Sequence, residues 1–370
     1  MLNQMHKKAI ISGGGTGGHI FPAIAIANEL KEQIPEVEIL FVGANNRMEM
    51  KRVPEAGYSI KGIDMYGLQR SLSIKSIIAN LKLPFRLWLS LRKAKKIILD
   101  FRPDVVIGVG GYVSGPVLRI AANKHIPTLI QEQNSYPGIT NKMLAKKASV
   151  ICTAYENLEK YFPLEKTVKT GNPVRKDIIH LPDDKSEAYA YFGLQAHKKT
   201  VSIIGGSLGA RSINESVKEI VNDMVSDDIQ LVWQTGEYYY ASIPEEMKQL
   251  NGIKILPFIQ RMDYLYQVSD VIVSRAGALS ISELCIVGKP CILIPSPNVA
   301  EDHQTKNANV LADAGAAICI ADKDAKEKLS YFLFELINNQ QKCKEMSLNL
   351  KKLAILDATK RIVNEIKKLI

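Results

Sequence analysis

Short apolar runs alternate along this chain with longer segments whose apolar residues recur at helical spacing. Near the start, Lys8–Ser12 is an apolar run, Gly13–Gly18 is rich in glycine, and apolar residues over Pro22–Lys31 follow the period of a helix. This order predicts a strand, a loop and a helix. Strands that alternate with helices are typical of a parallel sheet covered by helices on both faces. The pattern therefore predicts an α/β protein.

The same order of strand, glycine loop and helix begins again at Thr200–Ile204. Gly205-Gly-Ser-Leu-Gly209 is the second such loop, and a helix is predicted over Ile213–Val221. Two starts in 370 residues predict two Rossmann-like domains, with a boundary in the polar, proline-containing stretch Gly171–Lys185. Apolar runs predict the other strands: Val37–Val42, Asp104–Val109, Thr128–Gln131, Val150–Thr153, Gln230–Gln234, Val271–Ser274 and Cys291–Pro295.

These boundaries predict domains over residues 1–176 and 177–346, followed by a last helix over residues 347–370. An apolar stripe marks that helix, and we expect it to return to the first domain. The stripe consists of Leu353, Leu356, Val363, Ile366 and Leu369.

Composition and charge narrow the class of protein. Hydrophobic residues make up 46% of the chain, enough for two cores, and the net charge of +10 favours an anionic partner. The five cysteines are widely spaced and form no Cys-x-x-Cys, which argues against disulfides or a zinc site and for a reducing compartment. No apolar run approaches 18 residues, and Ala9–Ile11 is too short for a secretory signal. If this protein meets a membrane, we expect it to lie on the surface.

The basic excess is concentrated in one stretch. No acid occurs between Ser71 and Leu99, where basic residues interleave with apolar ones, among them Phe85 and Trp88. The pattern is typical of a surface that binds anionic membranes, although a core helix with a basic face would share it. No recognisable nucleic-acid fold accompanies it, so we expect no nucleic-acid partner. The basic residues are Lys75, Lys82, Arg86, Arg92, Lys93, Lys95 and Lys96.

The first glycine loop could bind an anionic ligand. Gly13, Gly15 and Gly18 satisfy G-x-G-x-x-G, but the second strand ends Phe41-Val-Gly-Ala44 without the acid that a dinucleotide's ribose requires. A nicotinamide dehydrogenase is therefore disfavoured. His19 follows at the helix start, where the dipole disfavours its charged form. A neutral imidazole there could act as a general base or make a purely structural hydrogen bond.

The second half offers a similar set of polar groups. Ser207 lies in the glycine loop and could cradle a diphosphate, while Glu283 could accept hydrogen bonds from a ribose diol. Ser280 and Glu283 also fit a capping box, which is the structural alternative. Asp322-Lys-Asp324 follows an apolar strand, and we interpret it as a solvated turn rather than a metal site. We therefore expect no metal or other cofactor, and stabilisation of leaving-group charge by helix N-termini and basic side chains.

Taken together, the motifs resemble one family: the glycosyltransferases of family 28 that add GlcNAc to undecaprenyl-pyrophosphoryl-MurNAc-pentapeptide in bacterial peptidoglycan synthesis. The resemblance covers nearly the whole chain. It is carried, in order, by Gly14–Pro22, Gly108–Pro116, Gln131–Asn134, Gly171–Arg175, Gly205–Arg211, Ser274–Glu283 and Asp302–Ala308. Each segment alone is a weak signal, but seven in the right order are specific.

The resemblance implies a GT-B fold, in which two Rossmann-like domains with parallel sheets face each other across a cleft. It also implies inverting transfer from UDP-GlcNAc to the C4 hydroxyl of MurNAc without a required metal. In this family the second domain holds most of the donor. By the resemblance Glu283 would hold the ribose, Ser207 the diphosphate and Gln304 the GlcNAc hydroxyls. Ile259 and the segment Ala278, Leu279, Ser280, Ile281 and Ser282 would lie near the uracil, and Thr16, Gly17, Gly18, Asn134 and Arg175 match further donor positions.

The acceptor side and the membrane surface follow from the same resemblance. Gly14, Gly15, Gly110, Gly111 and Tyr112 would face the acceptor's pyrophosphate, and either His19 or Glu132 would be the base. Residues Lys75, Lys82, Phe85, Arg86, Trp88 and Arg92 would dock on the anionic inner leaflet, at the cytoplasmic face of the plasma membrane. Partners would include proteins of cell-wall synthesis and division.

One residue departs from the family pattern, and two rival functions share part of it. The family usually has Gln where this chain has Leu208, so the resemblance implies no polar role for that side chain here. A GT-B enzyme with another lipid or natural-product acceptor would share the donor site. A non-catalytic sugar–lipid binding protein would keep the glycine loops without turnover.

Overall fold

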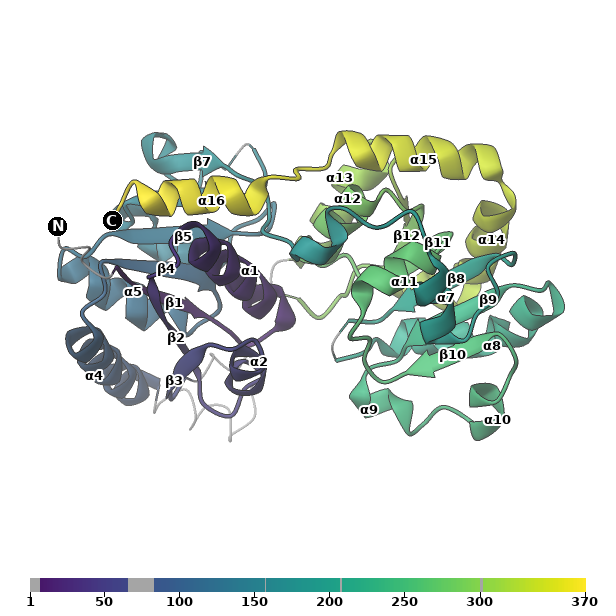
Figure 1. Cartoon of the computed structure of the whole chain (residues 1–370), viewed down its shortest axis with the longest axis horizontal. Helices are drawn as coiled ribbons and strands as arrows, with labels where there is room; N and C mark the ends of the chain where they lie inside the picture. Colours follow the sequence, from purple (N-terminus) through teal and green to yellow (C-terminus); the bar gives the residue numbers. More distant parts are fainter. Residues whose placement is uncertain (1–6, 66–82, 157, 207, 300–301) are drawn as a thin grey trace. The chain divides into compact units, whose positions relative to one another are not determined.

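The chain forms two compact units in the computed structural model, which describes residues 7–65, 83–156, 158–206, 208–299 and 302–370. Unit 1 combines Met1–Val174 with Asp357–Ile370, and unit 2 is Arg175–Leu356. Each unit contains one sheet whose paired strands are all parallel. The predicted α/β class with two parallel sheets is confirmed (Figure 1).

Unit 1 is built on a seven-stranded sheet with the order β3-β2-β1-β4-β5-β6-β7. Its central strands are apolar and buried along their length, as expected for a parallel sheet with both faces covered. The strands are β1 (Lys8–Gly13), β2 (Glu38–Ala44), β3 (Ser59–Ile63), β4 (Val105–Gly110), β5 (Thr128–Glu132), β6 (Val150–Thr153) and β7 (Thr167–Lys169).

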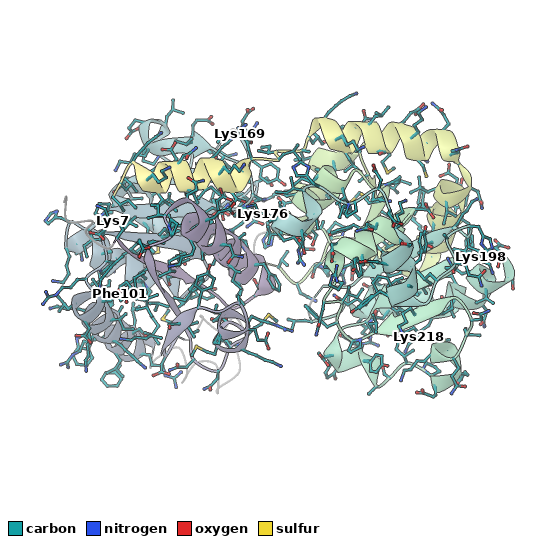
Figure 2. The ribbon with its side chains drawn as sticks, viewed as in Figure 1. Lys7, Phe101, Lys169, Lys176, Lys198 and Lys218 are labelled. Carbon is teal, nitrogen blue, oxygen red and sulfur yellow. The ribbon has the colours of Figure 1, made fainter. Side chains whose placement is uncertain are left out.

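Two layers of helices cover opposite faces of this sheet. Ile10 belongs to one core cluster and its neighbours Ala9 and Ile11 to the other, because successive side chains of a strand point to opposite faces. The first cluster includes residues of α4 (Leu83–Phe101), α5 (Ser114–Asn123) and α6 (Ile139–Leu144). Phe101, labelled in Figure 2, ends α4 and packs against this core. The second cluster includes residues of α1 (Gly17–Gln33), α2 (Glu49–Glu55) and α16 (Ala358–Lys367).

Unit 2 is built on a six-stranded sheet with the order β10-β9-β8-β11-β12-β13. The strands are β8 (Thr200–Ile204), β9 (Gln230–Gln234), β10 (Ile253–Leu256), β11 (Val271–Ser274), β12 (Cys291–Leu293) and β13 (Ile318–Cys319). Its helices include α7 (Ser186–Phe192), α8 (Arg211–Ser226), α11 (Met262–Val268), α12 (Ala278–Val287), α13 (His303–Asp313), α14 (Ala325–Asn338) and α15 (Gln340–Lys352).

The single helix predicted over residues 347–370 is wrong, because the chain forms two helices there. Residues of the predicted helix up to Lys352 end α15 in unit 2, whereas α16 begins at Ala358 and lies alongside α1 in unit 1 (Figure 1). Leu353 and Leu356 fall between the helices and are exposed, while Val363 and Ile366 are buried in the core of unit 1. The apolar stripe therefore combines exposed residues between two helices with buried residues of the second helix. Helical spacing alone does not distinguish the two.

We expect the burial of α16 to be a substantial part of the stability of unit 1. Ile362 is fully buried, so Ile362→Ala should lower the free energy of unfolding of unit 1 by about 2–4 kcal/mol. Leu356→Ala removes a side chain that is 51% exposed and should change it by less than about 0.5 kcal/mol. Hydrogen exchange in urea, followed by mass spectrometry, reports the two units separately. Equal effects of the two substitutions would contradict the packing role of α16.

Candidate functional site

In unit 1 the strand order reverses between β1 and β4, so the loops that follow these strands lie side by side. Ligands of open parallel sheets bind at such a reversal, beyond the carboxyl ends of the strands. Gly13 pairs with Gly110 in the register of the two strands. A Cβ at Gly111 would lie 2.4 Å from the carbonyl oxygen of Gly14, so the two glycine loops touch backbone to backbone. Tyr112 follows with an exposed ring.

A buried carboxylate that the sequence analysis missed shapes the first glycine loop. Glu49 accepts hydrogen bonds from the backbone N–H of Gly15 (3.1 Å) and of Ala44 (2.9 Å). It comes from the start of α2, five residues beyond the end of β2. An acid therefore does reach the end of the second strand, but it holds backbone groups there. In the sequence, the only sign of this role was an acidic residue shortly after the second strand, and no known motif has that spacing.

His19 lies in the first turn of α1, where the glycine loop orients its ring. Its Nδ1 is 3.1 Å from the carbonyl oxygen of Gly14 and 3.4 Å from Oγ1 of Thr16. A carbonyl oxygen can only accept, so in the neutral ring Nδ1 carries the proton and Nε2 the lone pair. The Nε2 edge faces Gly110, where a Cβ would lie 2.9 Å from it. The glycine at 110 leaves room for this ring.

Glu132, the alternative base, is bonded on both carboxylate oxygens. Oε1 accepts from the N–H (3.0 Å) and the side-chain amide (3.2 Å) of Asn134. Oε2 accepts from the N–H of Gly138 (3.1 Å) and from the amide of Asn141 (2.7 Å). The side chain is buried at the end of β5. These four hydrogen bonds tie the buried carboxylate to the loop that follows β5.

In unit 2 the strand order reverses between β8 and β11, which brings together the glycine loop after β8 and the segment before α12. Gly206 and Gly209 both have positive φ, and a Cβ at Gly209 would lie 2.2 Å from the carbonyl oxygen of Thr235. Leu208, the residue that departs from the family pattern, is 72% exposed. Ser207 lies outside the described residues.

Glu283 is the centre of a buried polar group in unit 2. Its Oε1 accepts from Nε of Arg175 (3.0 Å) and its Oε2 from the hydroxyl of Tyr266 (2.8 Å). Burial raises the pKa of Tyr266 well above its ordinary value, so the hydroxyl keeps its proton and donates. Burial alone would lower the pKa of the Arg175 guanidinium, but Glu283, Tyr266 and Asp177 together raise it by more, so the net shift of that pKa is upward.

The capping-box interpretation of Ser280 and Glu283 is wrong. Helix α12 begins at Ala278 with Gly277 as its N-cap, so Ser280 lies inside the helix and makes no cap. Glu283 lies in the second turn, with its carboxylate bonded to side chains rather than to the helix start. Its polar partners, and not the helix end, account for an acid at this position.

The other residues of unit 2 that are candidates for binding the nucleotide sugar lie on loops and at helix starts. Ile259 is buried, and its N–H donates to Oε1 of Gln234 (2.9 Å), which leaves its carbonyl as the group it can offer a ligand. Gln304 accepts from the N–H of Ser296 (2.8 Å). The first two turns of α12 supply the remaining candidates. Ala278 and Ile281 are buried there, and Leu279, Ser280 and Ser282 are half-buried.

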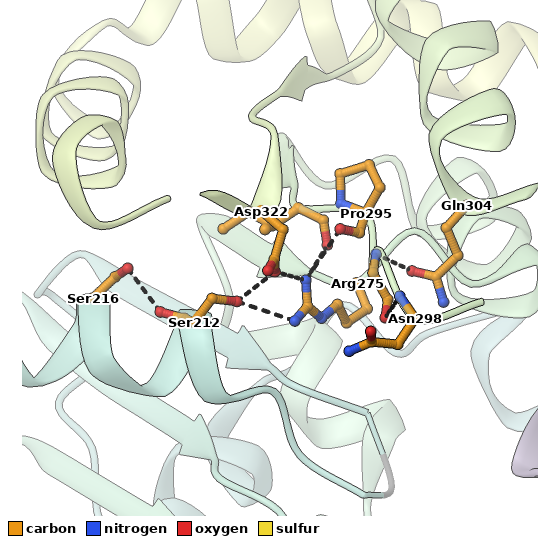
Figure 3. Close-up of polar contacts among 9 residues, drawn as sticks. Ser212, Ser216, Arg275, Pro295, Asn298, Gln304 and Asp322 are labelled. Atoms are coloured by element: carbon orange, nitrogen blue, oxygen red, sulfur yellow. Dashed lines mark hydrogen bonds and ion pairs between the residues drawn. The ribbon is translucent and has the colours of Figure 1, made fainter. Parts of the chain in front are cut away.

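The interpretation of Asp322-Lys-Asp324 as a solvated turn is wrong for Asp322. Its carboxylate accepts from Arg275 and from the hydroxyl of Ser212, both at 2.5 Å (Figure 3). Arg275 also donates to the carbonyls of Ile294 (3.0 Å) and Pro295 (3.2 Å). The group ties the ends of β11 and β12 to the start of α8. Across the described parts of both units, no three His, Cys, Asp or Glu side chains group so as to hold a metal ion.

Two family models match the chain, one in each half. Residues 9–153 match the N-terminal domain of glycosyltransferase family 28, and residues 200–362 match its C-terminal domain. The chain is 52% identical over 365 residues to a protein of Parabacteroides distasonis, and the match covers 98% of both chains. That protein is named UDP-N-acetylglucosamine--N-acetylmuramyl-(pentapeptide) pyrophosphoryl-undecaprenol N-acetylglucosamine transferase.

Solved structures agree with this match. The crystal structure of MurG from Acinetobacter baumannii is similar with a TM-score of 0.75 and 30% identity, covering 98% of this chain and 99% of that one. The glycosyltransferase of kitacinnamycin is similar with a TM-score of 0.70 over 99% and 100% of the chains, but at 16% identity. The second likeness concerns the fold alone.

The four hydrogen bonds of Glu132 predict a loss of stability rather than a specific loss of chemistry when it is removed. Glu132→Ala should lower the free energy of unfolding of unit 1 by on the order of 3 kcal/mol, because buried donors lose a charged acceptor. The control is Glu156→Ala, which removes an exposed partner of Lys169 and should leave the free energy of unfolding nearly unchanged. Urea unfolding measures both. An unchanged midpoint for Glu132→Ala would refute the structural role.

Proposed function

Because the chain belongs to glycosyltransferase family 28, we propose that it transfers GlcNAc from UDP-GlcNAc to the MurNAc of undecaprenyl-pyrophosphoryl-MurNAc-pentapeptide, for peptidoglycan synthesis. The observation that carries this is 52% identity, over 98% of both chains, to a protein named for that reaction. A transferase with a natural-product acceptor is the alternative. The likeness to such an enzyme is at 16% identity and concerns only the fold.

Unit 2 is proposed to hold the nucleotide sugar. Glu283 presents a buried carboxylate with two lone pairs on each oxygen, so it can accept from a ribose diol while it keeps Arg175 and Tyr266. The glycine loop after β8 precedes the N-terminus of α8, where backbone N–H groups favour a diphosphate. Gln304 and Ser207 are proposed for the GlcNAc hydroxyls and the diphosphate, as in the family.

Unit 1 is proposed to hold the acceptor, with His19 as the base. The loops at Gly14–Gly15 and Gly110–Gly111 carry little side-chain bulk, so backbone groups can approach a pyrophosphate closely. The bond from His19 Nδ1 to the Gly14 carbonyl supports a ring whose Nε2 accepts the proton of the C4 hydroxyl. The oxygen then attacks the sugar carbon, and UDP leaves with inversion at that carbon.

One assay tests the reaction and separates it from its alternatives. The purified chain is incubated with UDP-GlcNAc, with and without undecaprenyl-pyrophosphoryl-MurNAc-pentapeptide. We expect UDP release only with the acceptor, and a lipid product heavier by one GlcNAc. Release that needs a different lipid or natural-product acceptor would overturn the acceptor assignment. Binding of both substrates without turnover would identify a non-catalytic protein.

His19→Ala should lower kcat by about 10²–10⁴-fold without lowering the melting temperature, as expected when a general base is lost. The matched control is His125→Asn, an exposed histidine of the same unit whose positive φ suits asparagine. It should leave kcat unchanged. A His19→Ala variant with parental kcat would exclude this residue as the base.

Glu283→Ala should raise the KM for UDP-GlcNAc by about 10–150-fold, which corresponds to the loss of about 1.5–3 kcal/mol of charged hydrogen bonding to the ribose. Tyr266→Phe is the control, because it removes one partner of Glu283 but keeps the carboxylate. Its KM should change much less. If Glu283→Ala lost thermal stability but kept its KM for UDP-GlcNAc, the carboxylate would have only a structural role, as the hydrogen-bond partner of Arg175 and Tyr266.

Helix α4 is proposed to bind the anionic surface of the inner leaflet. Phe85 and Trp88 are 63% and 49% exposed, with ring centroids 5.9 Å apart, and Arg92 lies over the Trp88 ring at 4.7 Å. In Figure 2 the side chains on the outer side of α4 point away from the sheet. Exposed aromatic rings beside basic groups are typical of a membrane interface. Arg86 lies between them in the sequence, and Lys75 and Lys82 lie outside the described residues.

The rest of unit 1 supports the same surface. Large exposed apolar side chains occur on or next to α4, α5 and α6, whereas the described helices of the opposite layer, α1, α2 and α16, carry none. Within the described residues, no helix is long and apolar enough to cross a membrane. We propose a peripheral position at the cytoplasmic face of the membrane, on the surface formed by α4 and its neighbours. Proteins of wall synthesis and division are proposed as partners from the family resemblance alone.

Phe85→Ser with Trp88→Ser should weaken binding to vesicles that contain phosphatidylglycerol and should slow turnover of the long-chain acceptor. Turnover of a short, water-soluble acceptor should stay within about two-fold, because its encounter needs no membrane. Tyr331→Ser with Leu348→Ser is the matched control, since these side chains of unit 2 are 68% and 53% exposed. High salt should weaken parental binding without abolishing it, because salt screens only the charge contribution. Equal loss of both turnovers would identify α4 as a catalytic or core element.

A further inference from the structure

Gln234, the last residue of β9, connects two loops that lie far apart in the sequence. Its Nε2 donates to the carbonyl oxygen of Gly206 (3.0 Å), and its Oε1 accepts from the N–H of Ile259 (2.9 Å). The side chain is buried. A carbonyl only accepts and an N–H only donates, so the amide has a single satisfied orientation. Both ends of this side chain are therefore committed.

The sheet order explains why this residue reaches both loops. Strand β9 lies between β8 and β10, so the loop after β8, which contains Gly206, and the loop after β10, which contains Ile259, flank its carboxyl end. Gly206 has φ of +83°, and its carbonyl oxygen also accepts from the N–H of Gly209 (3.1 Å) within the same loop. The backbone of Gln234 adds a longer bond, from the N–H of Gly205 (3.4 Å). The side chain bonds to both loops directly.

We infer that Gln234 is a positioning residue for the nucleotide sugar. Its amide fixes the spacing between the loop after β8, proposed for the diphosphate, and the loop after β10, proposed for the uracil, before the ligand binds. The inference rests on the proposed function and on the family resemblance, which puts the diphosphate at the loop after β8 and the uracil near Ile259. A ligand that must order its own binding loops loses part of its binding free energy to that ordering. The loss should therefore fall on ligands that span both loops, and should spare ligands that touch only one.

Gln234→Met is the test, because methionine has similar length and makes neither hydrogen bond. The matched control is Gln230→Met, at the opposite end of the same strand. Gln230 is buried to the same degree, and its amide likewise accepts from an N–H (2.7 Å) and donates to a carbonyl (2.9 Å), both of Gln195. Its Nε2 donates in addition to Oγ1 of Thr200 (3.2 Å). Gln234→Glu is the second variant, because a carboxylate can still accept from Ile259 but cannot donate to Gly206. If Gln234→Met fails to fold, Gln234→Glu is used for the same measurements.

We expect Gln234→Met to raise the Kd of UDP and the KM of UDP-GlcNAc by about ten-fold or more, the scale of one or two lost hydrogen bonds. The Kd of uridine and the kcat at saturating donor should stay within about three-fold, since neither depends on the spacing of the loops. Gln234→Glu should weaken UDP similarly. Gln230→Met should leave all of these parameters unchanged while it lowers the melting temperature as Gln234→Met does.

Three results would overturn the inference. Equal weakening of UDP by Gln230→Met and Gln234→Met would mean a general loss of stability. Equal weakening of uridine and UDP by Gln234→Met would mean a contact role rather than a spacing role, and parental Kd values would mean no role. A parental enzyme that fails to bind UDP would refute the proposed function instead, so the two failures are distinguishable.

Discussion

In a parallel sheet the hydrogen-bond ladder brings the carboxyl ends of all strands to one edge, and the candidate residues of this chain depend on that arrangement. In unit 1 it sets Gly14 against Gly111 and turns His19 toward Gly110. In unit 2 it sets the glycine loop after β8 beside the start of α12. Residues that are a hundred positions apart in the sequence become neighbours because the strand order reverses at the middle of each sheet.

The loops at these edges are held by buried polar side chains. Glu49 and Glu132 bind backbone N–H groups in unit 1, and Gln234 and Arg275 bind backbone groups in unit 2. A buried carboxylate or amide is stable only when its hydrogen bonds are made, so each of these residues fixes the loop that satisfies it. Loops rich in glycine have few other constraints, and such fixed contacts let them meet a ligand in a defined shape.

Strands at the edges of the two sheets are predicted less well from apolar runs than central strands are. Strands β3, β7 and β10, which the apolar runs did not predict, are all edge strands, whereas β13 was expected as the apolar strand before Asp322. β3 and β10 each contain a lysine, and β7 is only partly buried. An edge strand pairs on one side and faces less of the core, so its sequence needs less apolar character. Central strands such as β4 and β8 are buried throughout and stand out in the sequence.

The sequence by itself determined the α/β class, the two sheets, the central strands and the family, because apolar periodicity and ordered glycine motifs are local properties of the chain. It also singled out Glu283 and His19. Only the tertiary structure decided which side chains and backbone groups the polar residues contact. Arg175 and Tyr266 converge on Glu283, Asp322 pairs with Arg275, and four donors surround Glu132. Helix spacing likewise did not show that the apolar stripe after residue 347 divides between two units. Hydrogen bonds and burial depend on which distant segments meet, and strand order in the folded sheets decides that.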